Sequence, residues 1–152
     1  METTPLAWKV VIDAADPHQQ AAFWAAALHY RVEDNSRLIS RLLAVGAVDE
    51  QETVEFQGHL AWRDLIAVRH PDDPFDPDSD LGRGRRILFQ RVPEPKVVKN
   101  RLHLDLHSPP GALESEVARL EALGAVVHER RARGGTEWVV MTDPEGGEFC
   151  LH

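Results

Sequence analysis

The chain has 152 residues, of which 43% are hydrophobic and 28% charged, so it is long enough for one globular domain that buries its own core. The formal net charge of −8 argues against nucleic acid as a partner, because an acidic surface repels phosphates. No segment resembles a membrane span or a signal peptide, and the single Cys150 cannot form an internal disulfide. These features predict a cytoplasmic protein that contacts neither membranes nor nucleic acids.

The first residues predict a strand followed by a helix. Residues 7–15 (AWKVVIDAA) are rich in β-branched side chains, which favour strands. Asp16 then supplies an N-cap, and Pro17 suits the first helical position. Along this helix Ala21 and Trp24 recur at helical spacing, so we expect Trp24 to lie in the core.

The next segment predicts a short strand at 30–33 and a second helix that Asn35 caps and Gly46 ends. Residues 47–71 predict one or two strands, the clearest at 65–69 (LIAVR).

Residues 71–82 (PDDPFDPDSDLG) place aspartates at alternating positions, as a calcium-binding loop does. However, Leu81 and Ile87 occupy the positions where that loop requires Gly and Glu. The segment therefore predicts an acidic surface loop, followed by a strand at 87–92.

Residues 99–108 (KNRLHLDLHS) alternate polar and apolar side chains, which predicts a half-buried strand. One face carries His103, Asp105 and His107, and the other carries leucines. Such a polar face suits a strand that lines a cavity.

The last third predicts a helix that begins at Ser108 or Pro109 and ends at Gly124. Strands at 125–129, 137–141 and 148–152 follow, with turns at 133–135 and 143–147. This order, one strand, one helix and three strands, repeats that of the first half, and Asp13 aligns with Asp105.

The duplicated βαβββ order, FWAAAL at 23–28, KNRLHLDL at 99–106 and DPEGGEFCL at 143–151 resemble the vicinal oxygen chelate superfamily, in particular its glyoxalase-like domains. The resemblance implies an α+β fold in which two βαβββ modules form curved mixed sheets that enclose a cavity, with the helices outside. The modules would span about 7–92 and 99–152 of a single domain, 1–152. Because this superfamily includes glyoxalase I, extradiol dioxygenases, fosfomycin-modifying transferases, epimerases and bleomycin-binding proteins that catalyse nothing, the fold does not select a reaction.

The resemblance also implies metal ligands on the first and last strands of each module. His103 matches the first-strand position of the second module, and the last-strand position falls on Cys150, with Glu148 two residues earlier on the same face. These three residues are the candidate ligands for zinc, nickel, iron or manganese. In the first module Val11 cannot bind a metal, and Gln90 lies nearest the last-strand position.

The competing interpretation is a site without metal. In that case His103 and Gln90 are hydrogen-bonded cavity residues and Cys150 is a small core residue. The predicted ligand-binding residues are then His103, Gln90, Asp105, Trp138 and Trp62, because tryptophans on or beside strands can stack on a flat ligand.

The predicted function is recognition of a small organic molecule in the cavity, without a complete standard metal site. The alternative is a divalent-metal-dependent lyase, isomerase or dioxygenase that acts on vicinal oxygens. The net acidity favours a cationic ligand, whereas Lys96, Lys99 and Arg101 favour a carboxylate. The sequence indicates no residue as the catalytic base. It is compatible with a homodimer but does not predict the oligomeric state.

Overall fold

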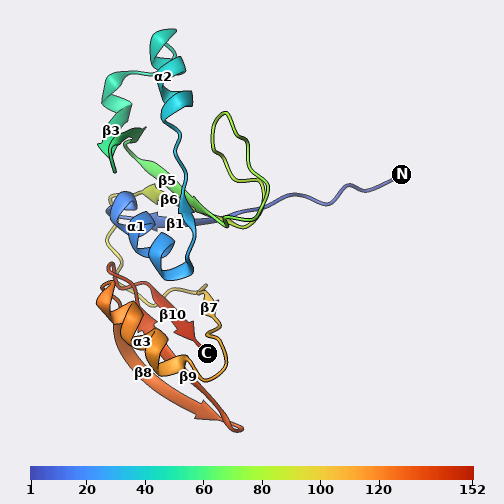
Figure 1. The fold of residues 1–152 in the computed structure, drawn as a ribbon, viewed down its shortest axis with the longest axis vertical. Helices are drawn as coiled ribbons and strands as arrows, with labels where there is room; N and C mark the ends of the chain where they lie inside the picture. Colours follow the sequence, from blue (N-terminus) through green and yellow to red (C-terminus); the bar gives the residue numbers. More distant parts are fainter. The chain divides into compact units, whose positions relative to one another are not determined.

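A computed structural model describes residues 1–152, which form two compact units, Met1–Val92 and Pro93–His152. Each unit is built on a four-stranded mixed sheet with its own helix (Figure 1). None of the three helices combines the length and the apolar character that crossing a bilayer requires.

The sheet of the first unit has the strand order β1-β6-β5-β2. The first strand runs parallel to the last, and the other neighbours are antiparallel. The helix α1 packs on β5 and β6. The bounds are β1 Val10–Ala14, α1 Pro17–Leu28, β2 Arg31–Val32, β5 Leu65–Arg69 and β6 Arg86–Arg91.

The predicted start of α1 is confirmed. The Asp16 carboxylate accepts hydrogen bonds from the backbone N–H groups of His18 and Gln19, each at 3.1 Å, and Pro17 occupies the first turn. Trp24 is only 2% exposed, so its assignment to the core is also confirmed.

An insertion separates β2 from β5. It comprises α2 Ser36–Ala44, the 3₁₀ helix η1 Glu50–Glu52, and a hairpin of β3 Thr53–Phe56 and β4 His59–Trp62. The prediction of one or two strands in residues 47–71 is therefore wrong, since β3, β4 and β5 all lie there. The two-residue turn Gln57–Gly58, with φ of 50° and 82°, joins β3 to β4 without the Asn-Gly or Asp-Gly signal that usually marks such turns.

The helix α2 begins where the sequence predicts, but Asn35 does not cap it with its side chain. Its amide instead donates to the Ser79 carbonyl at 2.8 Å. The Asp34 carboxylate accepts from the Ser36 N–H at 3.0 Å and supplies the cap.

Three arginines hold the acidic loop 71–82 in place. Arg85 pairs with Asp73 at 2.8 Å, Arg83 with Asp76 at 3.3 Å and Arg69 with Asp80 at 2.7 Å. The hydrogen bonds from Arg85 keep the pKa of Asp73 well below its ordinary value.

The second unit repeats the topology of the first, with the strand order β7-β10-β9-β8. Its first and last strands are again parallel, and its other neighbours are again antiparallel. The α+β fold with two βαβββ modules is thus confirmed. The bounds are β7 Asp105–Leu106, α3 Leu113–Ala122, β8 Val126–Arg133, β9 Thr136–Thr142 and β10 Glu148–Leu151.

The strand predicted at 99–108 is much shorter than expected. Only Asp105–Leu106 is a regular strand, and Leu102, predicted to be half-buried, is 87% exposed. The reason is that β7 is an edge strand whose only neighbour is β10. The bonds from the Cys150 and His152 N–H groups reach no further back than the Leu104 carbonyl.

The start predicted for the last helix is also wrong, since α3 begins at Leu113 rather than at Ser108 or Pro109. Both the N–H and the hydroxyl of Ser108 donate to the His152 carbonyl, at 2.7 and 2.6 Å, and this holds Ser108 beside the sheet. Gly111 then takes a left-handed φ of 76°, which interrupts any helix through it. The strand β8 runs to Arg133, past the predicted end at 129, because it pairs with the full length of β9.

Breaking the buried ion pair between Glu33 and Arg86 should destabilise the first unit. The Glu33 side chain is fully buried and accepts from Arg86 Nε at 2.9 and 2.8 Å and from the Gly82 N–H at 3.2 Å. Glu33→Gln leaves the Arg86 cation buried without its counter-charge, so we expect a loss of about 3 kcal/mol in the free energy of unfolding, measured by urea titration. The matched control, Glu114→Gln, breaks an exposed pair with Arg130 and should change the stability little. Equal effects of the two variants would contradict this account.

Candidate functional site

The polar face of the second sheet gathers chemically active side chains from neighbouring strands. In β7 and its flanks, His103, Asp105 and His107 are exposed, whereas Leu104 and Leu106 are half-buried. Asp105 is the register partner of Cys150 on β10. Because side chains alternate along a strand, Glu148, Cys150 and His152 share that face.

Asp105 lies at the centre of this cluster. Its Oδ1 is 3.2 Å from His103 Nε2, and its Oδ2 is 3.5 Å from His152 Nε2. One donor atom each from His103, Asp105 and Cys150 lie within 4.8 Å of one another. The fold therefore brings together an imidazole, a carboxylate and a thiol, which are all groups able to bind a divalent metal.

The Cys150 thiol favours its protonated form here. Burial raises its pKa, and the negative charge of Asp105 and the hydrogen bond to that carboxylate raise it further. A thiol in this state is a weak nucleophile, and a metal would have to displace its proton to bind.

Aromatic rings extend the same face. The His107 ring stacks on that of His152 with centroids 5.2 Å apart, and Trp138 on β9 lies 6.0 Å from His152 with an interplanar angle of 18°. Trp138, predicted from the sequence to bind a ligand, is half-buried beside the cluster. The stacked rings offer a flat surface to a planar ligand.

Glu148, predicted as a metal ligand with His103 and Cys150, is engaged elsewhere. Its carboxylate accepts from Lys96 Nζ and from the backbone N–H of Asn100, each at 3.1 Å. Burial raises its pKa, but these hydrogen bonds outweigh that effect and the pKa is lowered. Asp105 lies with His103 and Cys150 in the group that could hold an ion, and the role of Glu148 as a metal ligand stays a prediction.

Of the residues predicted in the first unit, Gln90 lies on the strand that corresponds to β10, and Trp62 lies in the insertion. Gln90 on β6 is exposed and is the register partner of Asp13, just as Cys150 is that of Asp105. Trp62 ends β4, half-buried, and its carbonyl lies 2.9 Å from His18 Nε2. The alignment of Asp13 with Asp105 is therefore also a structural equivalence.

Sequence reasoning missed His152 as a member of the cluster. The residue is two positions beyond Cys150 on an alternating strand, so the same periodicity that grouped His103 with Asp105 could have identified it.

The fold and the cluster together define a glyoxalase-like module pair with a polar site on its second sheet. The sequence model of the glyoxalase-like domain matches residues 9–152, so the chain belongs to this family, within the vicinal oxygen chelate superfamily. A search of curated proteins gave no match.

Solved structures support the same fold at low identity. The fosfomycin resistance protein FosX from Mesorhizobium loti has a TM-score of 0.61 at 9% identity, over 99% of this chain and 92% of that one. A variant of FosX from Listeria monocytogenes, solved with Mn(II) and 1S,2S-dihydroxypropylphosphonic acid, has a TM-score of 0.57 at 12% identity, over 99% and 90%. A glyoxalase/bleomycin resistance protein/dioxygenase family enzyme from Burkholderia phytofirmans PsJN has a TM-score of 0.58 at 13% identity, over 94% of each chain.

The raised pKa of Cys150 predicts slow alkylation at neutral pH. With iodoacetamide, the rate should rise with pH through an apparent pKa above the ordinary value of about 8.5 for a cysteine. Asp105→Asn removes the adjacent negative charge, so it should lower that apparent pKa and speed the reaction at pH 8. Glu137→Gln, exposed on β9, is the matched control, and an identical response of both variants would refute the role of Asp105.

Proposed function

We propose that the chain binds a small organic molecule on the polar face of the second sheet, through His103, Asp105, Cys150 and the ring of Trp138. The observation that carries this proposal is the convergence of the His103 imidazole and the Cys150 thiol on the Asp105 carboxylate. The proposal needs no metal ion, in keeping with the incomplete set of standard ligands in the sequence.

The hydrogen-bonding state of Asp105 supports a site without metal. Its two oxygens already face two imidazoles, and the Cys150 thiol bonds to the same carboxylate. These contacts give the carboxylate polar partners on both oxygens without an ion. They position the imidazole groups of His103 and His152 to donate to, or accept from, a polar group of the ligand.

The stacked rings support a ligand with a planar part. Trp138 and His152 lie nearly parallel, and a flat group could extend this stack. Together the polar cluster and the rings match a small molecule that has one flat apolar region and one hydrogen-bonding edge.

A divalent-metal-dependent lyase, isomerase or dioxygenase is the second candidate, and the donor set favours it. Catalytic metal sites use three protein donors and keep one position open, and His103, Asp105 and Cys150 would supply three, with the thiol favouring zinc. A bound metal would polarise vicinal oxygens of a substrate. The Mn(II) in the related FosX structure supports this candidate by analogy.

Metal content separates the two candidates. Metal binding requires the Cys150 thiol to lose its proton, and the raised pKa of that thiol opposes this. We therefore expect the protein, dialysed at pH 7, to hold much less than about one zinc, nickel, iron or manganese ion per chain by elemental analysis. Near-stoichiometric metal that is lost in His103→Ala and retained in His128→Ala would instead establish the metalloenzyme.

Ligand binding should be visible in thermal unfolding. A ligand at about 100 times its dissociation constant stabilises the folded state by about 2.7 kcal/mol, which is a clear shift in Tm. A screen should contain α-keto acids and cationic glycopeptides, because the acidic chain and the basic residues near Lys96 favour opposite charges. We expect His103→Ala to abolish the shift and His128→Ala, on the exposed strand β8, to preserve it. A shift that survives His103→Ala would place the ligand elsewhere.

A further inference from the structure

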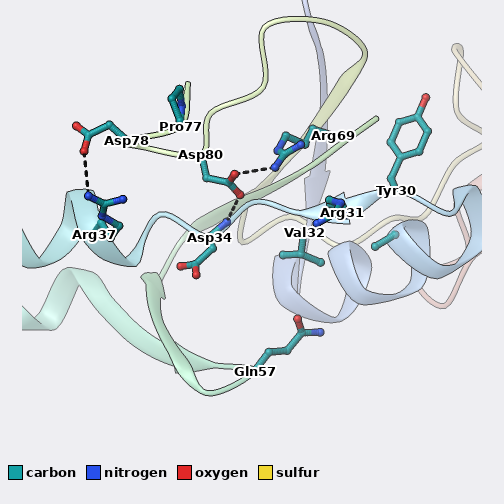
Figure 2. A pocket seen from close by; sticks show the side chains of 11 residues that line it. Tyr30, Arg31, Val32, Asp34, Arg37, Gln57, Arg69, Pro77, Asp78 and Asp80 are labelled. Atoms are coloured by element: carbon teal, nitrogen blue, oxygen red, sulfur yellow. Dashed lines mark hydrogen bonds and ion pairs between the residues drawn. The ribbon is translucent and has the colours of Figure 1, made fainter. Parts of the chain in front are cut away.

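The first unit contains a pocket that shares no residue with the site described above. It has a volume of about 450 Å³, which is within the range of small-molecule sites. Its walls come from α1, β2, the start of α2, the β3–β4 turn, β5 and the acidic loop (Figure 2).

Three arginines lie side by side on the sheet at this place. Arg31 on β2 is the register partner of Arg69 on β5, and Arg69 is that of Arg86 on β6. Register partners on adjacent strands point to the same face, so three guanidinium groups share one stretch of surface. Like charges placed directly opposite one another destabilise a sheet unless anions neutralise them.

Only two of these three charges are neutralised within the protein. Glu33 pairs with Arg86, and Asp80 pairs with Arg69. The guanidinium of Arg31, which lines the pocket, forms no hydrogen bond or ion pair. The row therefore carries one uncompensated positive charge, at an accessible position.

Arg69 adds unsatisfied donors to the pocket wall. Its residue is only 5% exposed, its Nη2 donates to Asp80, and its Nε and Nη1 have no partner. The guanidinium also lies 3.9 Å from the centre of the Phe75 ring, which further shields it from water. A cation removed from water in this way attracts a nearby anion more strongly than an exposed one does.

The acidic residues of the pocket are all engaged. Asp80 accepts from Arg69 and from the Asp34 N–H, and Arg37 lies 3.9 Å from Asp78 (Figure 2). Asp78 also pairs with Arg41 at 2.6 Å. Asp34 accepts from the Ser36 N–H, and His59 Nδ1 lies 3.9 Å from its carboxylate. Among the guanidinium groups that line the pocket, only that of Arg31 has no carboxylate partner, so it is the cation available to a ligand.

We propose that this pocket binds a small organic anion through a carboxylate or phosphoryl group held by Arg31, in the field of the buried Arg69. The planar guanidinium fork matches the paired oxygens of both groups. Gln57, from the β3–β4 turn, has a side-chain amide without a partner and can bond to a second polar group of the ligand (Figure 2). This site goes beyond the proposed function, because it uses the insertion and the acidic loop of the first unit.

The test is a titration of the full chain with inorganic phosphate and, separately, with succinate, at constant ionic strength set by chloride. Amide NMR shifts should saturate and be confined to the segments around Val32, Asp34 and Gln57. Arg31→Gln should weaken the binding of the better probe about tenfold, which corresponds to about 1.4 kcal/mol. The stronger of the two probes identifies the anion as a phosphoryl or a carboxylate group.

The matched control is Arg133→Gln, which removes an exposed and unpaired arginine from the second unit and should leave the affinity unchanged. Saturation by neither anion, shifts centred outside the pocket, or equal losses in the two variants would each overturn the proposal. His103→Ala should also leave this binding unchanged, so a failure here is distinct from a failure of the proposed function.

Discussion

The parallel pairing of the first and last strands of each unit is the constraint on which the remaining structure depends. Because parallel strands cannot be joined by a tight turn, the chain passes from the first strand through a helix and two further strands before it reaches the last, in the same order in both sheets. The parallel pairing also sets the register that places Asp13 beside Gln90 and Asp105 beside Cys150. The candidate site is thus a direct consequence of how each module closes.

Asp105 has a double role within that frame. Its two oxygens face two imidazoles, and the same carboxylate completes a set of three possible metal donors. An ion at this place would have to take over these contacts of Asp105. It would also require the Cys150 thiol to lose its proton, which burial and Asp105 both oppose by raising the pKa of that thiol.

The two modules carry chemically different side chains at equivalent positions of their first and last strands. The second keeps His103 where the first has Val11, and Cys150 where the first has Gln90. The first module instead carries an insertion and an acidic loop, which lie beside a row of arginines across β2, β5 and β6. One topology thus supports two unlike polar surfaces, since sheet register and not side-chain chemistry maintains the fold.

Local patterns were sufficient for much of this protein. The Asp16–Pro17 cap, the buried Trp24, the module repeat and the polar face of His103, Asp105 and His107 all follow from short-range periodicity and capping chemistry. Only the tertiary structure decided that β7 has two residues and that Ser108 bonds to the sheet instead of starting a helix. It also decided that the Glu148 carboxylate pairs with Lys96. It likewise decided that Arg31, Arg69 and Arg86 align. Each of these depends on a partner far away in the chain, which spacing along one strand or helix cannot specify.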